Sequence, residues 1–467
     1  MVSLVVRSLA FVTLLTACGA NSQGSDFEPS AAGGSSGSGG SATPAAGGSS
    51  GAGSLGGTDG SGGSTTSAGT GSASSGTGGA TAGAAGSAPG GAGMGGANEL
   101  PPGAFVHPGI LVNQNMLGFV RDKLAEGAEP WKSALSKART SRFGSLDYVP
   151  HPRETVECGP ISNPDVGCSD EKNDCVAAYT HALLWAYTGD AQHAQKAIQI
   201  MNAWSGTIKK HINSNAPLQS AWVMETFPRA AEIIRYSNAS WPREESERFG
   251  DMLRNVYQPL IENGSASNGN WETSMIEATL NIAIYNNDRP LFEKGIEMWR
   301  ERTPAYAYLK SDGATPVPPP RGNKTGSALI GFWYGQDTFS DGLSQETCRD
   351  LSHVQYGFAG IINAAETALI QGVDLYAEES ERLRAMLEFH ARYINGAGVP
   401  GSLCGGSLTD VRADPMWEIA LNHFVMRRGG TLPETQKLAL KIRPTGVDHH
   451  MAWETLTHAG LGSVGVE

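Results

Sequence analysis

The feature that most constrains the fold is a polar spacing that occurs twice within apolar helical patterns. The stretches "LLWAYTGDAQHAQKAIQI" (183–200) and "NIAIYNNDRPLFEKGIEM" (281–298) share the spacing Tyr-x-x-Asp-x5-Lys-x-Ile. Each predicts an apolar helix, a short turn with Gly or Asn that tolerates a left-handed backbone, and a second amphipathic helix. A third stretch, 362–394, has the same outline without the shared residues. The chain therefore contains repeated αα-hairpins.

Repeated helical hairpins predict an all-α curved array. Such an array either stays open as a solenoid or closes, wholly or partly, into a toroid of inner and outer helices. The repeats are unequal in length, and 311–344 is a long loop rich in Pro, Gly and Ser. A regular superhelical scaffold would keep its loops short. We therefore expect an α/α toroid, an incomplete barrel of αα-hairpins with long loops over a central cleft, at 104–467.

The first 103 residues have a different composition. Residues 1–18 hold Arg7, a short apolar run and Cys18, which indicates an export signal because the run is too short to span a bilayer. Leu15 and the small residues before Cys18 resemble a bacterial lipobox, which implies a lipidated Cys18 and, with Gly19 following, outer-membrane anchoring. A plain secretory signal is the alternative. Residues 19–103, almost entirely Gly, Ser, Ala and Thr, predict a disordered linker. Periplasmic and cell-surface orientations both stay open.

The net charge limits the classes of partner, and the cysteines predict a disulfide. Residues 103–467 carry 33 basic and 42 acidic side chains, a net charge of −9 that argues against nucleic acid and anionic lipid as main partners. In an exported protein, "ECGPISNPDVGC" predicts a disulfide between Cys158 and Cys168. The five cysteines after the signal leave at least one unpaired, and Cys348 is a candidate. No cysteine has zinc-site spacing, and no metal or cofactor is expected.

Two polar clusters are candidates for chemistry. In "CRDLSHVQYG" (348–357), Arg349, His353 and Tyr356 fall within roughly a 60° arc of one helix face. In "SASNGNWETSMIEATL" (265–280), Asn268 and Asn270 precede a predicted helix. They either cap that helix or direct amide donors at a bound carboxylate, with the helix N-terminus adding positive potential.

These residue types suit the β-elimination of a uronic acid within a polysaccharide. The C5 proton is α to a carboxylate and weakly acidic, because the resulting enolate adds charge to an anion. Arg and Asn donors neutralise that carboxylate. A tyrosine, as phenolate or beside a histidine, then takes the C5 proton, and a phenol returns a proton to the O4 leaving group. The product carries a 4,5-unsaturated sugar at the new non-reducing end.

The chain from about Asn113 to Arg428 resembles the alginate lyase superfamily of polysaccharide lyases, whose catalytic domain is an α/α toroid. The stretches that carry the resemblance are "VECGPISNPDVGC", "AYTHALLWAYTGD", "LQSAWVMETFPRAAEIIR", "NGNWE", "CRDLSHVQYGFAG" and "WEIALNHF". The Arg-x6-Tyr spacing is the most specific element. It implies that Arg349 neutralises the substrate carboxylate and that Tyr356 is the general base and acid.

The sequence departs from the family at one element, an Asn-His pair shortly before a tryptophan. Ahead of Trp271 it has Ser, Asn, Gly and Asn and no histidine. His353 is the first candidate for the missing imidazole and His423 the second, and the identity of the base between Tyr356 and His353 stays open. The departure also leaves the substrate open between alginate, glucuronan and other uronans.

Further side chains are expected in a substrate cleft, where inner-helix packing is the alternative role for some of them. The substrate-binding candidates are Trp271, Gln219, Trp222, Arg229, Trp333, Tyr334 and His423. The expected partner is an anionic polysaccharide, and the expected oligomeric state is a monomer. Two other functions stay possible. A glycoside hydrolase would use paired carboxylates from Asp341, Glu346 and Glu272, and a surface glycan-binding lipoprotein would not need Tyr356.

Overall fold

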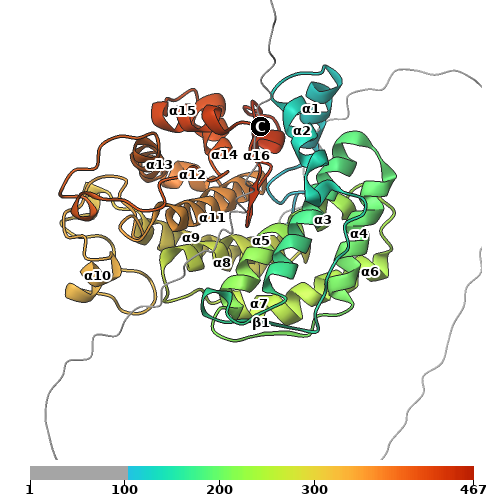
Figure 1. Cartoon of the computed structure of the whole chain (residues 1–467), viewed down its shortest axis with the longest axis horizontal. Coiled ribbons are helices and arrows are strands. Elements are labelled where there is room, and N and C mark those ends of the chain that lie inside the picture. Colours follow the sequence, from blue (N-terminus) through green and yellow to red (C-terminus); the bar gives the residue numbers. More distant parts are fainter. Residues whose placement is uncertain (1–103, 467) are drawn as a thin grey trace, which may run out of the picture. The chain divides into compact units, whose positions relative to one another are not determined.

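The computed structural model describes residues 104–466 of the chain, and these form a predominantly helical unit (Figure 1). The helices are α1 (Gln114–Ala125), α2 (Trp131–Thr140), α3 (Cys168–Thr188), α4 (Ala191–Ser205), α5 (Ala216–Arg235), α6 (Arg243–Met252), α7 (Gln258–Ile261), α8 (Gly269–Tyr285), α9 (Arg289–Tyr306), α10 (Ser327–Phe332), α11 (Leu351–Ile370), α12 (Leu375–Glu378), α13 (Ser380–Ile394), α14 (Glu418–Leu421), α15 (Pro433–Ile442) and α16 (Glu454–His458). The strands are β1 (Thr155–Cys158), β2 (Asp165–Val166), β3 (Lys210–Ile212), β4 (Val447–Asp448) and β5 (Met451–Ala452).

Four long helices form the inner layer of this unit. Helices α3, α5, α8 and α11 pack side by side in that order, and almost every residue of α5, α8 and α11 is buried. Helices α4 and α9 lie outside them, each packed on the inner helix that precedes it in the chain (Figure 1). These helices are buried on all sides, although they carry buried polar residues such as Glu225, Arg229 and Glu277. The predicted all-α toroid is confirmed.

The repeated sequence spacing corresponds to one turn between an inner and an outer helix. After α3, Gly189 adopts a left-handed backbone (φ 70°), and the Asp190 carboxylate accepts a hydrogen bond from the Gln192 amide. After α8, Asn287 is left-handed (φ 56°), and Asp288 caps α9 in the same way. The repeated spacing therefore places a cap at the start of both α4 and α9.

The third predicted hairpin uses the same device without the shared residues. Gly372 follows α11 with a left-handed backbone (φ 85°), and the Asp374 carboxylate accepts from the Ala377 amide at the start of α12. A left-handed residue followed by a capping Asp thus occurs in all three hairpins, although the third lacks the other shared residues.

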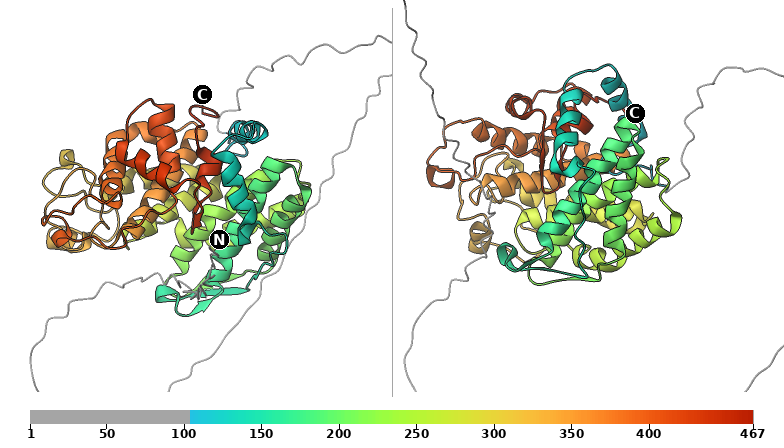
Figure 2. Two further views of the ribbon diagram at one scale, coloured as in Figure 1. Left: turned by 45° about the horizontal axis from the view of Figure 1, so that its top comes forward. Right: turned by 45° about the vertical axis from the view of Figure 1, so that its right-hand side comes forward.

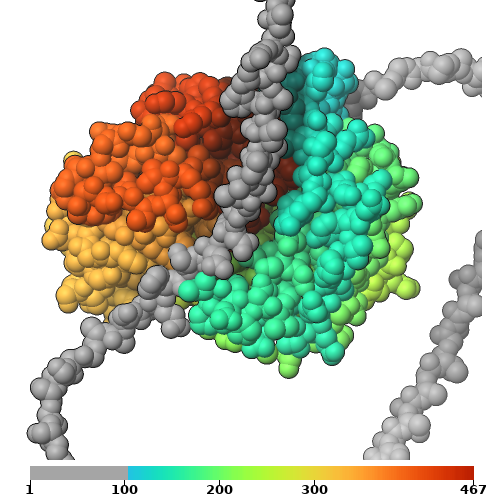
Figure 3. Space-filling model, in the orientation of Figure 1, coloured from blue at the N-terminus to red at the C-terminus, as the bar shows by residue number. Residues whose placement is uncertain are grey.

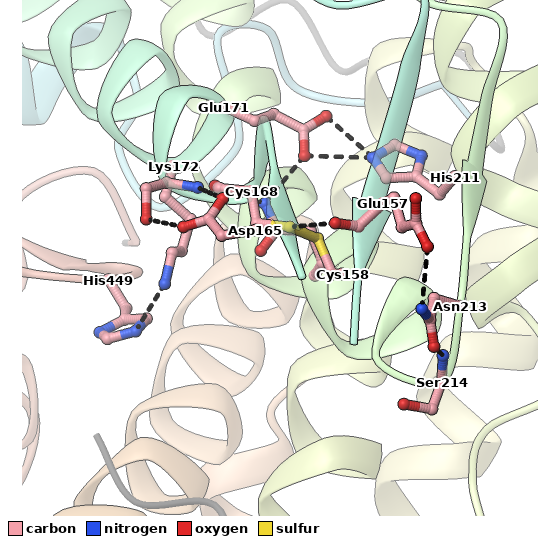
Figure 4. The surroundings of a disulfide bond; sticks show 12 residues. Glu157, Cys158, Asp165, Cys168, Glu171, Lys172, His211, Asn213, Ser214 and His449 are labelled. Atoms are coloured by element: carbon pink, nitrogen blue, oxygen red, sulfur yellow. Dashed lines mark hydrogen bonds and ion pairs between the residues drawn. A yellow bond between two sulfur atoms is a disulfide. The ribbon is translucent and has the colours of Figure 1, made fainter. Parts of the chain in front are cut away.

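Two disulfides join four of the five described cysteines. Cys158 at the end of β1 is bonded to Cys168 at the start of α3 (Figure 4). Strand β1 also pairs with β2 antiparallel and with β3 parallel. The suggestion that Cys348 is unpaired is wrong, because Cys348 is bonded to Cys404. The free cysteine among the described residues is Cys175, which is buried in α3.

The C-terminal segment returns to the start of the domain. Helix α16 packs against α1 and α2, so the dark red and teal segments lie side by side in Figures 1 and 2. The His458 Nε2 lies 3.1 Å from the Leu111 carbonyl oxygen. Just before α16, the short β4–β5 hairpin extends toward the inner helices. Within residues 104–466, no helix combines the length and apolarity that a membrane crossing requires.

Candidate active site

The N-terminal halves of the four inner helices meet at one end of the array. The Lys172 ammonium of α3 lies 5.1 Å from the ring centroid of Trp222 on α5, and that ring lies 6.4 Å from the Tyr356 ring on α11. Asn268 is the N-cap of α8. Helix N-termini carry partial positive charge, so their meeting favours an anionic ligand. In the space-filling view, the surface is hollowed between the teal segment and the orange C-terminal half (Figure 3).

The predicted cluster at the start of α11 forms a chain of contacts. Asp350, the N-cap of α11, places its Oδ2 2.6 Å from His353 Nδ1, and His353 Nε2 lies 3.0 Å from Arg349 Nη2. Burial opposes ionisation of Asp350, but the bond to His353 holds the pKa of this carboxyl below its ordinary value. The carboxylate therefore accepts from His353, and His353 orients Arg349.

Glu346 is the second group that fixes Arg349. Its carboxylate accepts from Arg349 Nη1 at 2.8 Å and from the Tyr306 hydroxyl at 2.9 Å. It also accepts from the backbone N–H and the side-chain amide of Asn270, at 2.9 and 2.6 Å. These four donors fully satisfy a buried carboxylate, which compensates for its desolvation. The structure thus places Asn270 behind Arg349, with its amide donors turned to Glu346.

Asn268 lies closer to the surface, beside Tyr334. Its side-chain oxygen is 3.3 Å from Gln345 Nε2, and its side chain interacts with the Tyr334 hydroxyl. Tyr334 is 41% exposed and has a left-handed backbone (φ 56°), which costs free energy for a residue with a Cβ. Arg349 and Tyr334 are close enough to interact electrostatically. Asn268, Tyr334 and Arg349 therefore lie close together.

Tyr356 is buried with its hydroxyl 3.5 Å from both carboxylate oxygens of Asp448. Burial, followed by the negative charges of Asp448 and Asp414, raises the pKa of Tyr356 well above its ordinary value of 10. The phenol therefore keeps its proton at neutral pH. The protonated phenol is suited to donate a proton to a leaving group. Removal of a proton from the substrate would then be the task of a separate base.

The β4–β5 hairpin is a part of the site that the sequence pattern did not predict. The ring of His449 lies 4.9 Å from the Tyr356 ring and 4.7 Å from the Trp222 ring. Its Nδ1 lies 2.5 Å from Asp448 Oδ1, and its Nε2 lies 3.3 Å from Lys172 Nζ (Figure 4). The acid–imidazole run Asp-His-His at 448–450 was the available signal. Nothing in the local pattern indicated which helix it would contact.

Two predicted substrate-binding residues of α5 lie beneath the cluster. Gln219 is buried, and its amide donates to the Cys168 carbonyl at 3.0 Å and to Glu171 at 2.8 Å. Arg229 is buried in an ion pair with Glu277 and donates to the His450 carbonyl at 2.9 Å. Both side chains support the walls of the site through these contacts.

Three aromatic candidates differ in their surroundings. Trp271 is half-buried at the start of α8, next to Asn268 and Asn270. Trp333 is only 1% exposed and packs edge-on against the Phe339 ring, which favours a role in the core. Trp222 is buried, and its indole N–H has no hydrogen-bond partner among the described residues.

His423 lies apart from this cluster. It stacks on Tyr376 with 3.6 Å between the ring centroids, and its Nδ1 is 2.9 Å from Arg427. Arg427 in turn pairs with Glu366, near the C-terminal end of α11. Tyr356 lies almost three turns closer to the helix start, and a helix rises 1.5 Å per residue, so His423 is remote from the cluster.

The carboxylates of the alternative hydrolase are not arranged as a free pair. Glu346 is bound by its four donors, and Glu272 is fully buried in ion pairs with Arg302 and Arg321. Asp341 is exposed and accepts from the Lys310 amide. In the part of the chain that the structure describes, no group of three or more His, Cys, Asp or Glu side chains is placed to hold a metal ion.

Comparisons with known proteins place the chain in a family. The family described as "Alginate lyase" has a sequence model that matches residues 120–398, more than half of the chain. No curated protein matches the chain. Alginate lyase A1-III from Sphingomonas species A1 is structurally similar, with a TM-score of 0.51 and 16% identity over 73% of this chain and 94% of that one.

Two further structures show the same fold. An alginate lyase from Bacteroides ovatus matches with a TM-score of 0.50 and 16% identity, covering 76% of this chain and 100% of its own. A variant of alginate lyase A1-III complexed with a tetrasaccharide has a TM-score of 0.50 and 17% identity, with 73% and 93% of the two chains covered. Because the family model matches more than half of the chain, the chain belongs to the alginate lyase family of polysaccharide lyases.

Proposed function

We propose that the protein cleaves a uronic-acid polysaccharide of the alginate or glucuronan type by β-elimination. The observation that carries this proposal is the fixed orientation of Arg349, which Glu346 and His353 hold from two sides at the start of α11. A guanidinium fixed in this way needs no reorganisation when negative charge develops on a nearby carboxylate. The tetrasaccharide complex of the related alginate lyase supports a saccharide ligand at this fold.

The substrate carboxylate would lie against Arg349 and Asn268. The guanidinium offers planar paired donors that match a carboxylate, and the Asn268 amide adds a third donor at the start of α8. Neutralisation of this carboxylate lowers the barrier to removal of the C5 proton. Trp271 and Tyr334 offer flat faces beside Asn268 on which a sugar ring stacks.

Tyr356 would transfer a proton to the leaving group. Its raised pKa keeps the phenol protonated, so it can donate to O4 as the C4–O4 bond breaks. His353 lies beside it, with 5.7 Å between the ring centroids, and acts mainly by orienting Arg349. Arg349, just before α11, and Tyr356, within its second turn, therefore have separate roles, charge neutralisation and proton transfer.

The test uses polymannuronate, polyguluronate, glucuronan and hyaluronan in the presence of a chelator. β-Elimination produces unsaturated ends that absorb in the ultraviolet, whereas hydrolysis produces new reducing ends without that absorbance. We expect turnover of at least one uronan. Tyr356→Phe should lower kcat by about 10²- to 10⁴-fold with substrate binding retained, which is the usual contribution of a general acid or base. Unchanged turnover in Tyr356→Phe would refute the proposed role, and a purely hydrolytic product would refute the lyase mechanism.

We also propose that the enzyme is exported and anchored in the outer membrane through Cys18, facing the periplasm or the cell exterior. The lipobox-like sequence and the Gly- and Ser-rich segment that follows support this location. Both segments lie outside the described residues. A tether of this kind would let a monomeric catalytic domain reach a polymeric substrate away from the membrane.

A further inference from the structure

Tyr356 lies between two similar chains of contacts. On one side are Asp350, His353 and Arg349, and on the other side Asp448 and His449 followed by Lys172 of α3. In both chains a carboxylate faces imidazole Nδ1 and a cation faces Nε2. The two imidazole rings lie 5.7 and 4.9 Å from the Tyr356 ring, measured between centroids.

The neighbours of His449 select one of its neutral tautomers. Burial opposes ionisation of Asp448, but the hydrogen bond from His449 holds the pKa of Asp448 below its ordinary value, so this carboxylate is an acceptor. Nδ1 must then carry the proton. The Lys172 ammonium can only donate, so Nε2 presents its lone pair. A neutral imidazole with a lone pair at Nε2 is the form that a general base requires.

The two imidazoles differ in how firmly a cation is held against the lone pair of Nε2. Nε2 of His353 faces a guanidinium that Glu346 holds in place. Nε2 of His449 faces an ammonium on a flexible four-carbon stem. The side chain of His449 is also more exposed than that of His353, 23% against 11%. A bound carboxylate can attract Lys172 away from His449, whereas Arg349 stays beside His353.

The start of α8 has no room for an imidazole in the position before Asn270. A Cβ added to Gly269 would lie 2.0 Å from the ring of Tyr306, which no real side chain could tolerate. Tyr306 cannot easily move, because its hydroxyl is bound to Glu346. A catalytic imidazole must therefore come from another part of the chain. The matched family segment ends at residue 398, so His449 lies beyond it.

We propose that His449 is the general base of the elimination and that Lys172 is a second cation for the substrate carboxylate. This inference rests on the proposed lyase function. The C5–H bond breaks, its proton passes to His449 Nε2, and its electron pair forms the C4=C5 double bond. The C4–O4 bond breaks, its own electron pair stays with O4, and O4 takes the Tyr356 proton. After product release, the proton on His449 returns to the Tyr356 phenolate through water, so the site is restored.

The charged and titratable groups around His449 come from its own hairpin, from helices α3 and α11, and from the loop that precedes the hairpin. Asp448 and the buried imidazole of His450 belong to its own hairpin, Lys172 comes from α3 and Tyr356 from α11. Arg412, from the preceding loop, lies 3.7 Å from the Asp448 carboxylate. The acidic limb of kcat/KM should report protonation of His449 within this set.

The test is His449→Asn, because His449 has a left-handed backbone (φ 49°) that Asn adopts readily. We expect kcat to fall about 10²- to 10⁴-fold with KM little changed. The acidic limb of kcat/KM should disappear, and added imidazole should restore part of the rate. Lys172→Met should instead raise KM. The matched control is His151→Gln, an exposed histidine outside the site, which should keep wild-type kinetics.

The outcomes separate this inference from the proposed function. If His449→Asn has wild-type kcat while Tyr356→Phe is inactive, the lyase function stands and His449 is not the base. A lowered kcat with an intact acidic limb and no rescue by imidazole would also refute the base assignment, because it indicates a structural role. If His449→Asn lowers the thermal midpoint, His449→Gln replaces it with the same expected kinetics. An absence of unsaturated product from the wild type refutes the proposed function itself.

Discussion

Carboxylates of three acidic residues orient the individual side chains of the site. Glu346 and Asp350 lie behind Arg349 and His353, and Asp448 lies behind His449. Each carboxylate orients a cation or an imidazole before substrate arrives. This preorganisation lowers the reorganisation needed in the transition state. It also makes the site sensitive to substitutions that do not touch substrate, because a buried guanidinium that loses its partner is costly.

A buried carboxyl away from the site predicts how stability depends on pH. Burial raises the pKa of Glu454 to about 8, although the backbone amides of Glu418 and Ile419 donate to it. The folded chain thus retains a proton that the unfolded chain releases near pH 4.5. Stability therefore falls as pH rises from about 4.5 to 8, by about 3 kcal/mol at pH 7.

The variant Glu454→Gln stays neutral in both states and lacks this contribution. We expect its free energy of unfolding to decline less than that of the wild type between pH 5 and 8. Denaturant titrations at several pH values measure this difference. Buried histidines such as His450 act in both proteins and cancel in the comparison. Parallel pH profiles for the two proteins would contradict the assignment.

The start of α11 depends on a loop that comes much later in the chain. Cys404 is bonded to Cys348, directly before Arg349. Thr409 continues the same contact, since its hydroxyl donates to the Arg349 carbonyl at 2.8 Å and its carbonyl accepts from the Leu351 amide at 3.0 Å. The loop therefore fixes the backbone that carries the carboxylate-binding guanidinium.

Replacement of both Cys348 and Cys404 by Ser should destabilise the protein and weaken substrate binding. The sequence separation of this disulfide is 56, and that of the Cys158–Cys168 disulfide is 10. Loop-closure entropy predicts losses of about 4 and about 3 kcal/mol respectively. Denaturant titration of both double variants tests this order. KM should rise in the Cys348/Cys404 variant, and a smaller loss of stability there than in the control pair would contradict the expectation.

The whole domain is organised so that distant parts of the chain meet at one end of the inner layer. The site draws on residues from Lys172 to His449, and α16 closes the array against α1 and α2. A single extended core of this kind should unfold cooperatively. Residues 19–103, in contrast, are almost entirely Gly, Ser, Ala and Thr.

A chain that begins at Ala104 should therefore keep the wild-type kcat and thermal midpoint but leave the membrane fraction. The loss of Cys18 and the linker removes the proposed anchor and no catalytic group. Cell fractionation, turnover of soluble uronan and thermal unfolding measure the three properties. A large fall in kcat or midpoint would show that the N-terminal segment contributes to the catalytic domain. Retention in the membrane fraction would contradict anchoring through Cys18.

The fold and part of the site could be predicted because they depend on interactions between residues that are close in the sequence. The αα-hairpins follow from helical patterns separated by left-handed Gly or Asn and capping Asp, interactions that span only a few residues. Helical periodicity places His353 and Tyr356 on one face of α11, as predicted. Arg349 lies just before the N-cap Asp350, outside the helix, and joins the cluster through its contacts with His353 and Glu346.

The rest of the candidate site is formed by packing between distant parts of the chain, which local sequence patterns do not predict. Asn268 and Asn270 are two residues apart, yet one lies beside Tyr334 and the other is bound to buried Glu346. His449 follows Tyr356 by more than 90 residues and reaches it only because the β4–β5 hairpin folds against the inner helices. Sequence periodicity orders side chains on one element, whereas burial and contact between elements decide which of them share a site.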